Sequence, residues 1–277
     1  MNHSDIGDQR PPIPDPMKRE VRQRCGFGCV ICGLPLYTYE HILGYANVKR
    51  HVANELTLLC DQHQRESTNK LLTREQIIRA DKEPYNLREG VSKPYTLHYE
   101  GSDCIVDIGS NVYSFRDEGY GAEFVALALD DDPIISFRLD SGHWLLNLNV
   151  YDRNDDLILL IADNELIYSP ISWDIELVGH NLVIHEAQRK ILLDILFEPP
   201  SKIKIQRGHF LHKDIEVEII QNCLKIVNTG CTFTRCGSWG CTHAMLIGNM
   251  VRPNNWGFHM IVRKRSEVRI KETDRSY

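Results

Sequence analysis

The stretch "CGFGCVICG", residues 25–33, places three cysteines within eight residues and determines how the first third of the chain is interpreted. A second pair of candidate ligands, Cys60 and His63, follows in "CDQH", residues 60–63. Zinc prefers four soft or borderline ligands in a tetrahedron, and two ligand pairs on tight turns bring such ligands together from separate parts of a chain. The spacing therefore predicts a structural Zn²⁺ site that is formed by Cys29, Cys32, Cys60 and His63.

Other interpretations of these cysteines stay open at this level. Cys25 is close enough in sequence to replace Cys29 as a ligand, and the cysteines are alternatively ordinary core residues. A zinc ribbon without an enzymatic role is a further rival. The glycines beside the cysteines suit a tight turn, and "LTLLC", residues 56–60, is typical of a strand that delivers Cys60 to the start of a helix.

The composition describes a globular protein: 277 residues are 42% hydrophobic and 25% charged. No apolar run reaches the roughly 20 residues of a membrane helix, and the polar, proline-rich start does not resemble a signal sequence. We therefore expect a cytoplasmic protein without a membrane partner. Nine cysteines, an odd number with several at ligand spacings, favour metal binding and free thiols over disulfides.

Proline-rich and charged segments predict the domain boundaries. Residues 1–16 contain four prolines and are predicted to be disordered. Residues 17–82 form the predicted zinc domain, in which Thr73 and Gln76 predict a capping box at the start of a short helix. Residues 83–94 are charged and interrupted by prolines, which predicts a linker.

From residue 95 to 262 the sequence consists of short, alternating or β-branched runs such as "HWLLNLNVYD" and "KIKIQRG". The predicted fold class is α+β, with a small zinc-stapled domain followed by a larger all-β domain, either a sandwich or a short β-solenoid. Residues 144–184 are echoed in residues 191–226, which indicates an internal duplication or chance similarity between strands. Residues 263–277 form a basic tail.

The charge is unevenly distributed. Residues 17–82 contain eleven Lys and Arg against seven Asp and Glu, a net charge of +4, so the rest of the chain carries −10 of the total of −6. A basic segment on an acidic protein is expected if only that segment contacts phosphate. This asymmetry favours nucleic acid as a partner of the zinc domain.

The order of features between residues 21 and 80, a quarter of the chain, resembles the HNH endonuclease family in its zinc-containing form. These features are the Cys-x-x-Cys pair, the acid-His-Ile triplet "EHI" at residues 40–42, the strand that ends in Leu-Cys, and the second ligand pair at the start of a helix. The resemblance implies a ββα-metal fold, in which a β-hairpin and a helix enclose a catalytic metal and the zinc holds the two ends together.

The resemblance also implies catalytic roles. His41 corresponds to the general base that deprotonates water, and Glu40 to the ligand of a catalytic Mg²⁺ or another divalent cation. Gln64 stands where the family usually carries His or Asn. Asn54 stands one residue before the position of the family's middle Asn, which is held here by Glu55. The candidate catalytic residues are His41, Glu40, Asn54 and Gln64.

Basic side chains surround these positions in the sequence. They are phosphate-directed cations of the kind that fixes the register of DNA without reading its bases. We therefore expect DNA as the partner, contacted by Lys49, Arg50, His51, Arg65, Lys70 and Arg74.

Two functions remain in competition. The first is an active DNA endonuclease whose β-domain recognises a target, controls the nuclease or forms a homo-oligomer, as in restriction or phage-defence proteins. The second is a zinc-stabilised module that has lost catalysis and binds nucleic acid or protein, and position 64 separates the two. Later cysteines with wide spacings are interpreted as packing residues, with a second metal left open, at Cys231, Cys236, Cys241 and His243.

Overall fold

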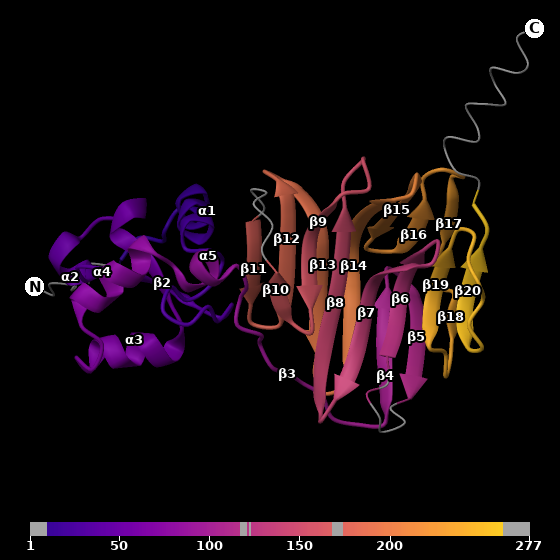
Figure 1. The fold of residues 1–277 in the computed structure, drawn as a ribbon, viewed down its shortest axis with the longest axis horizontal. Coiled ribbons are helices and arrows are strands. Elements are labelled where there is room, and N and C mark those ends of the chain that lie inside the picture. Colours follow the sequence, from indigo (N-terminus) through magenta and orange to yellow (C-terminus); the bar gives the residue numbers. More distant parts are fainter. Residues whose placement is uncertain (1–9, 117–120, 122, 168–173, 263–277) are drawn as a thin grey trace, which may run out of the picture. The chain divides into compact units, whose positions relative to one another are not determined.

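The computed structural model describes residues 10–116, 121, 123–167 and 174–262 (Figure 1). The chain divides into two compact units, unit 1 (Met1–Glu89) and unit 2 (Gly90–Tyr277). Among the described residues, unit 1 holds the helices and a small sheet, and unit 2 consists of strands in larger sheets. The protein is therefore mixed α+β and mostly β, and no described helix has the length and apolarity required to cross a membrane.

Unit 1 is built on a two-stranded antiparallel sheet followed directly by a helix. Thr38 lies opposite Leu59, and His41 lies opposite Leu56. Cys60 is the N-cap of the following helix, which confirms the predicted delivery of Cys60 from strand to helix. The elements in chain order are α1 (Asp15–Arg24), β1 (Thr38–His41), α2 (Tyr45–Val48), the 3₁₀ helix η1 (Ala53–Glu55), β2 (Leu56–Leu59), α3 (Asp61–Thr68), α4 (Arg74–Lys82) and α5 (Tyr85–Glu89).

The core of unit 1 forms around β2, whose four residues are all buried. Leu56 and Leu58 are fully buried and belong to one cluster with Val21 of α1 and Ile77 of α4. Each such side chain contributes about 1.5–3 kcal/mol by leaving water. The predicted capping box of α4 is confirmed, because Thr73 accepts a bond from the Gln76 N–H and the Gln76 side chain accepts one from the Thr73 N–H.

The predicted linker at 83–94 requires correction. Residues 85–89 form α5 of unit 1, where Asn86 is 1% exposed and donates a hydrogen bond to the Gly26 carbonyl at 2.6 Å. Val91 forms a bridge with Ile167 in unit 2. The boundary between the two units along the chain therefore falls between Glu89 and Gly90.

The predicted disorder of residues 1–16 also requires correction from Arg10 onward, whereas residues 1–9 lie outside the described residues, as does the predicted tail at 263–277. Helix α1 begins at Asp15 after Pro14 and carries a proline in its first turn, where the missing N–H costs no helical hydrogen bond. Ile13 and Met17 pack against the core of unit 1. These contacts attach the proline-rich segment to the unit.

Unit 2 contains two large sheets. The eight-stranded sheet of the described residues comprises β3 (Leu97–His98), β6 (Glu123–Leu129), β7 (Asp132–Asp140), β8 (His143–Tyr151), β9 (Leu157–Ala162), β10 (Glu165–Ile167), β19 (His243–Ile247) and β20 (Trp256–Met260). The ten-stranded sheet comprises β4 (Asp103–Ile108), β5 (Asn111–Arg116), β11 (Asp174–Val178), β12 (Asn181–Ala187), β13 (Lys190–Glu198), β14 (Lys202–His212), β15 (Ile215–Ile220), β16 (Cys223–Ile226), β17 (Cys231–Phe233) and β18 (Gly237–Ser238).

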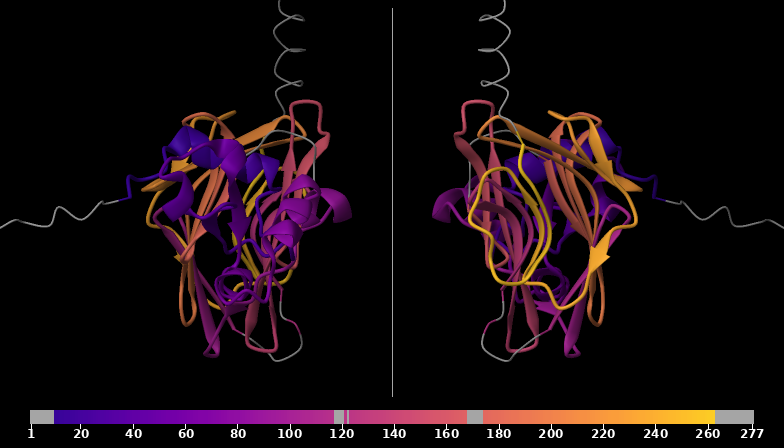
Figure 2. Two further views of the ribbon diagram at one scale, coloured as in Figure 1. Left: turned by 90° about the vertical axis from the view of Figure 1, so that its left-hand side faces the viewer. Right: turned by 90° about the vertical axis from the view of Figure 1, so that its right-hand side faces the viewer.

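Both sheets are mainly antiparallel meanders of consecutive strands. Strands β6 to β10 pair in sequence in one sheet, and β11 to β17 pair in sequence in the other. The parallel pairs are β6 with β19, β19 with β20, β4 with β14 and β5 with β18. The two sheets face one another (Figure 2). Phe115 of β5 stacks on Phe124 of β6 at 4.6 Å between ring centroids, so aromatic packing joins the layers and the fold of unit 2 is a sandwich and not a solenoid.

The structure does not bear out the possible internal duplication. The first run, residues 144–184, supplies β8, β9 and β10 to one sheet and β11 and β12 to the other. The second run, residues 191–226, lies entirely in the ten-stranded sheet. Two copies of one unit would occupy equivalent places, so the echo reflects the shared alternation of half-buried strands.

Candidate metal centre and adjoining polar site

The four predicted zinc ligands come together in unit 1. Cys29 and Cys32 lie in the turn after α1, Cys60 caps α3, and His63 lies in the first turn of α3. Their ligand atoms all lie within 4.8 Å of one another. The shorter separations are 3.1 Å from Cys60 Sγ to His63 Nδ1, 3.4 Å from Cys29 Sγ to His63 Nδ1 and 3.9 Å from Cys32 Sγ to Cys60 Sγ.

This geometry fits a zinc ion. A tetrahedron with Zn–S bonds of about 2.3 Å and a Zn–N bond of about 2.0 Å has edges of roughly 3.5–3.8 Å. The three shorter separations, 3.1–3.9 Å, bracket those edges, and all of the ligand atoms lie within 4.8 Å of one another. Three cysteines and one histidine are a closed structural ligand set, so the donors suit a metal that stabilises the fold and leaves no position open for substrate.

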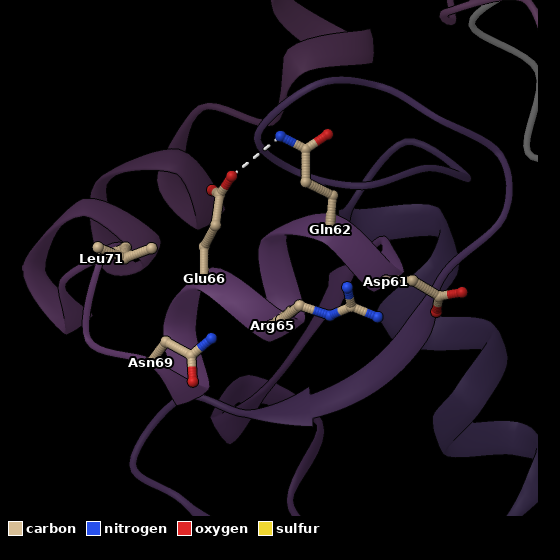
Figure 3. A pocket seen from close by; sticks show the side chains of 6 residues that line it. All are labelled: Asp61, Gln62, Arg65, Glu66, Asn69 and Leu71. Carbon is tan, nitrogen blue, oxygen red and sulfur yellow. Dashed lines mark hydrogen bonds between the residues drawn. The ribbon is translucent and has the colours of Figure 1, made fainter.

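His63 is oriented by its own helix. Its Nδ1 faces the three sulfur atoms, and its Nε2 lies 4.0 Å from Glu66 Oε2, one turn along α3. The other oxygen of Glu66 accepts a hydrogen bond from Gln62 at 2.9 Å, as Figure 3 shows. Glu66 therefore lies near the second ring nitrogen, at a separation longer than a hydrogen bond, while Nδ1 faces the sulfur atoms.

The thiols alone cannot all ionise. A hydrogen bond from Cys29 stabilises the Cys32 thiolate and lowers the pKa of Cys32 to about 5. The same hydrogen bond, together with burial, raises the pKa of Cys29, and burial raises the pKa of Cys60. A divalent cation held by Cys29, Cys32, Cys60 and His63 would supply the compensating charge, because a coordinating thiol is deprotonated outright.

Cys25 does not replace Cys29 as a ligand. Its Sγ donates instead to Asp81 Oδ1 at 3.8 Å, and burial raises the pKa of the Cys25 thiol to about 12. Asp81 also pairs with Arg24 at 2.5 Å, which joins α1 to α4. The sequence left Cys25 open as an alternative, and its partner assigns it to packing.

The glycines of the cysteine turn make room for α5. Asn86 faces two of them, and a Cβ at Gly28 would lie 2.6 Å from Asn86 Nδ2. A Cβ at Gly33 would lie 2.3 Å from Asn86 Oδ1 and 2.5 Å from Tyr85 Cδ1. Helix α5 therefore packs against the turn that carries Cys29 and Cys32, and the Asn86 hydrogen bond to the Gly26 carbonyl joins the two.

Replacing Gly33 with Ala is expected to destabilise unit 1 by about 1–3 kcal/mol more than replacing Gly90 destabilises the protein, because only Gly33 lacks space for a methyl group. Gly33 and Gly90 share the left-handed backbone cost at φ +76° and +74°, but a Cβ at Gly90 meets nothing within 4 Å. Urea unfolding followed by circular dichroism, with zinc content as a second readout, measures the difference. Equal losses in the two variants would contradict the packing role of Asn86.

His41 lies at the end of β1 and is 3% exposed. Arg10 Nη2 lies 3.0 Å from its Nδ1, and since a guanidinium only donates, Nδ1 accepts. The Nε2 nitrogen therefore carries the proton and donates to the Arg50 carbonyl at 3.1 Å. His51 continues the network, with Nδ1 3.1 Å from His41 Nε2 and Nε2 2.7 Å from the Pro11 carbonyl.

The surroundings of His41 keep its imidazole neutral. Burial lowers the pKa of His41 below its usual value of 6.5, and the nearby Arg10 charge lowers it further. Tyr45 packs beside the ring at 5.1 Å between centroids. A neutral imidazole with one fixed N–H and one accepting nitrogen is suited to take up a proton.

Glu40 of β1 and Gln64 of α3 are in direct contact. Gln64 Nε2 donates to Glu40 Oε2 at 3.3 Å, which joins α3 to β1. Glu40 precedes His41 in the strand, so the two side chains leave opposite faces of the backbone. The Gln64 amide thus presents an N–H group, and not its oxygen, to the Glu40 carboxylate.

The other predicted catalytic position lies apart from these contacts. Asn54 is exposed in η1. Glu55 beside it is paired with Arg50, whose Nε lies 3.3 Å from Glu55 Oε2. This hydrogen bond lowers the pKa of the Glu55 carboxyl. The carboxylate of Glu55 is therefore paired with Arg50.

The predicted DNA contacts occupy different places. Arg50 and His51 touch His41 directly, and Arg74 donates to the Leu43 carbonyl at 3.4 Å, just beyond β1. Lys49 and Lys70 are exposed. Arg65 lines an open pocket of about 340 Å³ on the solvent side of α3, where acidic and amide groups surround it (Figure 3), with Asp61, Gln62, Glu66, Asn69 and Leu71 as the other lining residues.

The later cysteines do not form a second metal site within the described residues, where the Cys29 cluster is the group with metal-binding geometry. Cys241 is buried and its Sγ lies 3.7 Å from the Ser114 carbonyl. Cys236 lies 3.7 Å from the Thr234 carbonyl. The interpretation of these residues as packing cysteines is the one that fits their contacts.

Comparison with known proteins gives only partial similarity. No protein-family model matches the chain, and no solved structure gives a significant match. A stretch of 86 residues, 31% of the chain, is 29% identical to glutamate–tRNA ligase of Bacillus licheniformis, and the ligase of Bacillus subtilis matches with the same identity and length. The chain spans about a fifth of the length of these curated relatives, because the match covers 18% of each ligase.

Proposed function

We propose that unit 1 is an HNH-type nuclease domain of the ββα-metal class, which hydrolyses phosphodiester bonds in DNA with a divalent cation and is stabilised by structural zinc. The observation that carries the proposal is the state of His41. Its Nε2–H is held by the Arg50 carbonyl and its Nδ1 is an acceptor, which is the arrangement a general base requires.

The neighbouring residues support the same chemistry. Glu40 lies next to His41 in β1 and is bonded to Gln64 of α3. A divalent cation held by the Glu40 carboxylate would neutralise charge at the phosphate and at the leaving oxygen. Lys49 and Arg74 are exposed, and Arg74 contacts the Leu43 carbonyl just beyond β1, so we expect these two cations to bind the flanking phosphates.

The second candidate is a module that binds nucleic acid without cutting it. One observation favours it: Gln64 presents its amide N–H to Glu40, so the amide is a donor to the carboxylate and not a second oxygen ligand. In this case unit 1 keeps its fold and its basic surface, and lacks the capacity to hold the cation. Recognition, control or self-association through unit 2 stays a prediction under both functions.

Nicking of supercoiled plasmid separates the two functions. Wild-type protein is incubated with Mg²⁺, Mn²⁺ or Ni²⁺ and, as the reference, without added divalent cation, so that the zinc is not stripped by a chelator. Glu40→Gln removes the cation-binding charge and keeps the side-chain shape. A transfer RNA is included as a second substrate, because the partial similarity is to glutamate–tRNA ligases. Cation-independent nicking, or unchanged nicking by Glu40→Gln, would refute the proposal.

Replacing Gln64 with His is expected to maintain or raise nicking, by up to about tenfold. An imidazole at this position is a better ligand than an amide for Mn²⁺ and Ni²⁺, so the preference should move from Mg²⁺ toward those ions. Initial nicking rates across the three cations measure the shift. If wild type is inactive with every cation and Gln64→His is active, the natural chain is the binding module of the second candidate.

A further inference from the structure

Arg10 occupies the nitrogen that the proposed base would use. Its Nη2 donates to His41 Nδ1 at 3.0 Å, and Nδ1 is the atom that must accept the proton of the attacking water. His41 is only 3% exposed, whereas Arg10 is itself exposed. The base is therefore covered by a side chain that faces solvent.

The segment around Arg10 is held on both sides. The Pro11 carbonyl accepts from His51 Nε2 at 2.7 Å, and the Arg10 guanidinium lies over the Tyr45 ring at 4.8 Å. Ile13 packs against the core of unit 1 before α1 begins. Prolines stiffen the segment, which reduces the entropy lost when Arg10 is held over His41.

We propose that Arg10 and Pro11 form an inhibitory strap that closes the His41 site in the absence of nucleic acid. The inference rests on the proposed function. The closing bond joins a guanidinium to a neutral ring nitrogen, whereas a phosphate offers a guanidinium two charge-assisted bonds. A nucleic-acid backbone near unit 1 is therefore a stronger partner for Arg10 than His41 is, and drawing Arg10 away uncovers Nδ1.

The first test measures access to His41 without using nuclease activity. Diethyl pyrocarbonate modifies the unprotonated nitrogen of an imidazole, which for His41 is the nitrogen covered by Arg10. Mass spectrometry of wild type should show slow modification of His41 relative to exposed His98, and Arg10→Ala should raise the His41 rate about tenfold, because one hydrogen bond to a charged group is lost.

Arg79→Ala is the matched control, since it removes the same charge from an exposed position of α4 in the same unit. It should leave the modification of His41 unchanged, and both variants should retain zinc. An unchanged His41 rate in Arg10→Ala would overturn the strap.

The second test is plasmid nicking by the same variants, in which Arg10→Ala should be faster than wild type. Slower nicking by Arg10→Ala would show that Arg10 serves the substrate and does not restrain the site, and would overturn the inhibitory role. If no variant nicks plasmid while Arg10→Ala still exposes His41 to the reagent, Arg10 does cover His41, but the nuclease proposal fails and the inhibitory role fails with it.

Discussion

Loss of the metal from the Cys29 cluster is expected to unfold unit 1 and to leave unit 2 folded. Structural zinc contributes about 10–16 kcal/mol of apparent binding free energy at pH 7, which matches or exceeds the roughly 5–15 kcal/mol that stabilises an ordinary domain. Three cysteines and one histidine supply that energy only when folded, so Cys60→Ser should have the same effect as chelation.

Two optical signals separate the units. All four tryptophans of the chain belong to unit 2, and the described helices belong to unit 1. Zinc removal should therefore abolish the helical signal at 222 nm and leave tryptophan fluorescence unchanged, and elemental analysis should find about one zinc per chain before treatment.

Cys25→Ala is the control, because Cys25 is as buried as Cys29 and Cys60 but its thiol is hydrogen-bonded to Asp81. It should retain zinc. Retention of zinc by Cys60→Ser, or its loss from Cys25→Ala, would show that the ligand set is different.

The zinc ligands could be predicted because local spacing determines their chemistry. Cys29 and Cys32 share one tight turn, and Cys60 and His63 share one helical turn, so each pair is formed by neighbours in the sequence. Only the contact between the two pairs joins parts of the chain that are far apart in sequence. Because zinc requires four ligands, that contact can be predicted without knowledge of the fold.

The predictions of disorder at residues 1–16 and of a linker at 83–94 were based on prolines, and both required correction. In segment 83–94, Pro84 precedes α5, and the contact of Asn86 with Gly33 depends on packing between parts of the chain far apart in sequence. The same holds for Arg10, which belonged to a segment interpreted as disordered. Nothing local in either segment signals its partner, and both were therefore missed.

Two strands of the eight-stranded sheet do not show the alternating pattern that predicts a half-buried strand. Strand β6, "EFVALAL", is buried from its second residue to its last, and β19, "HAMLI", is buried after its first residue. A strand covered on both faces lacks the alternation of a half-buried strand. Strand β8, quoted in the sequence analysis as "HWLLNLNVYD", shows that alternation throughout.

Replacing His41 with Ala is expected to lower the nicking rate by about 10²–10⁴-fold, the usual contribution of a positioned general base. Zinc content and DNA affinity should remain close to wild type, because His41 is not among the metal ligands. The matched control is His98→Ala, which replaces an exposed histidine of unit 2. Initial rates, elemental analysis and a binding titration measure the three quantities. Equal losses in binding and cutting would indicate a structural role for His41 and not a catalytic one.

The pH dependence identifies the base more sharply. A base must be unprotonated, and the pKa of His41 is lowered below 6.5 mainly by burial, so wild-type nicking should persist as pH falls to 6.5 and decline only below that value. This acid limb should be absent from the residual activity of His41→Ala. Because protonation of a group elsewhere would leave the limb in place, a limb that survives the substitution would transfer the role of base from His41 to another residue.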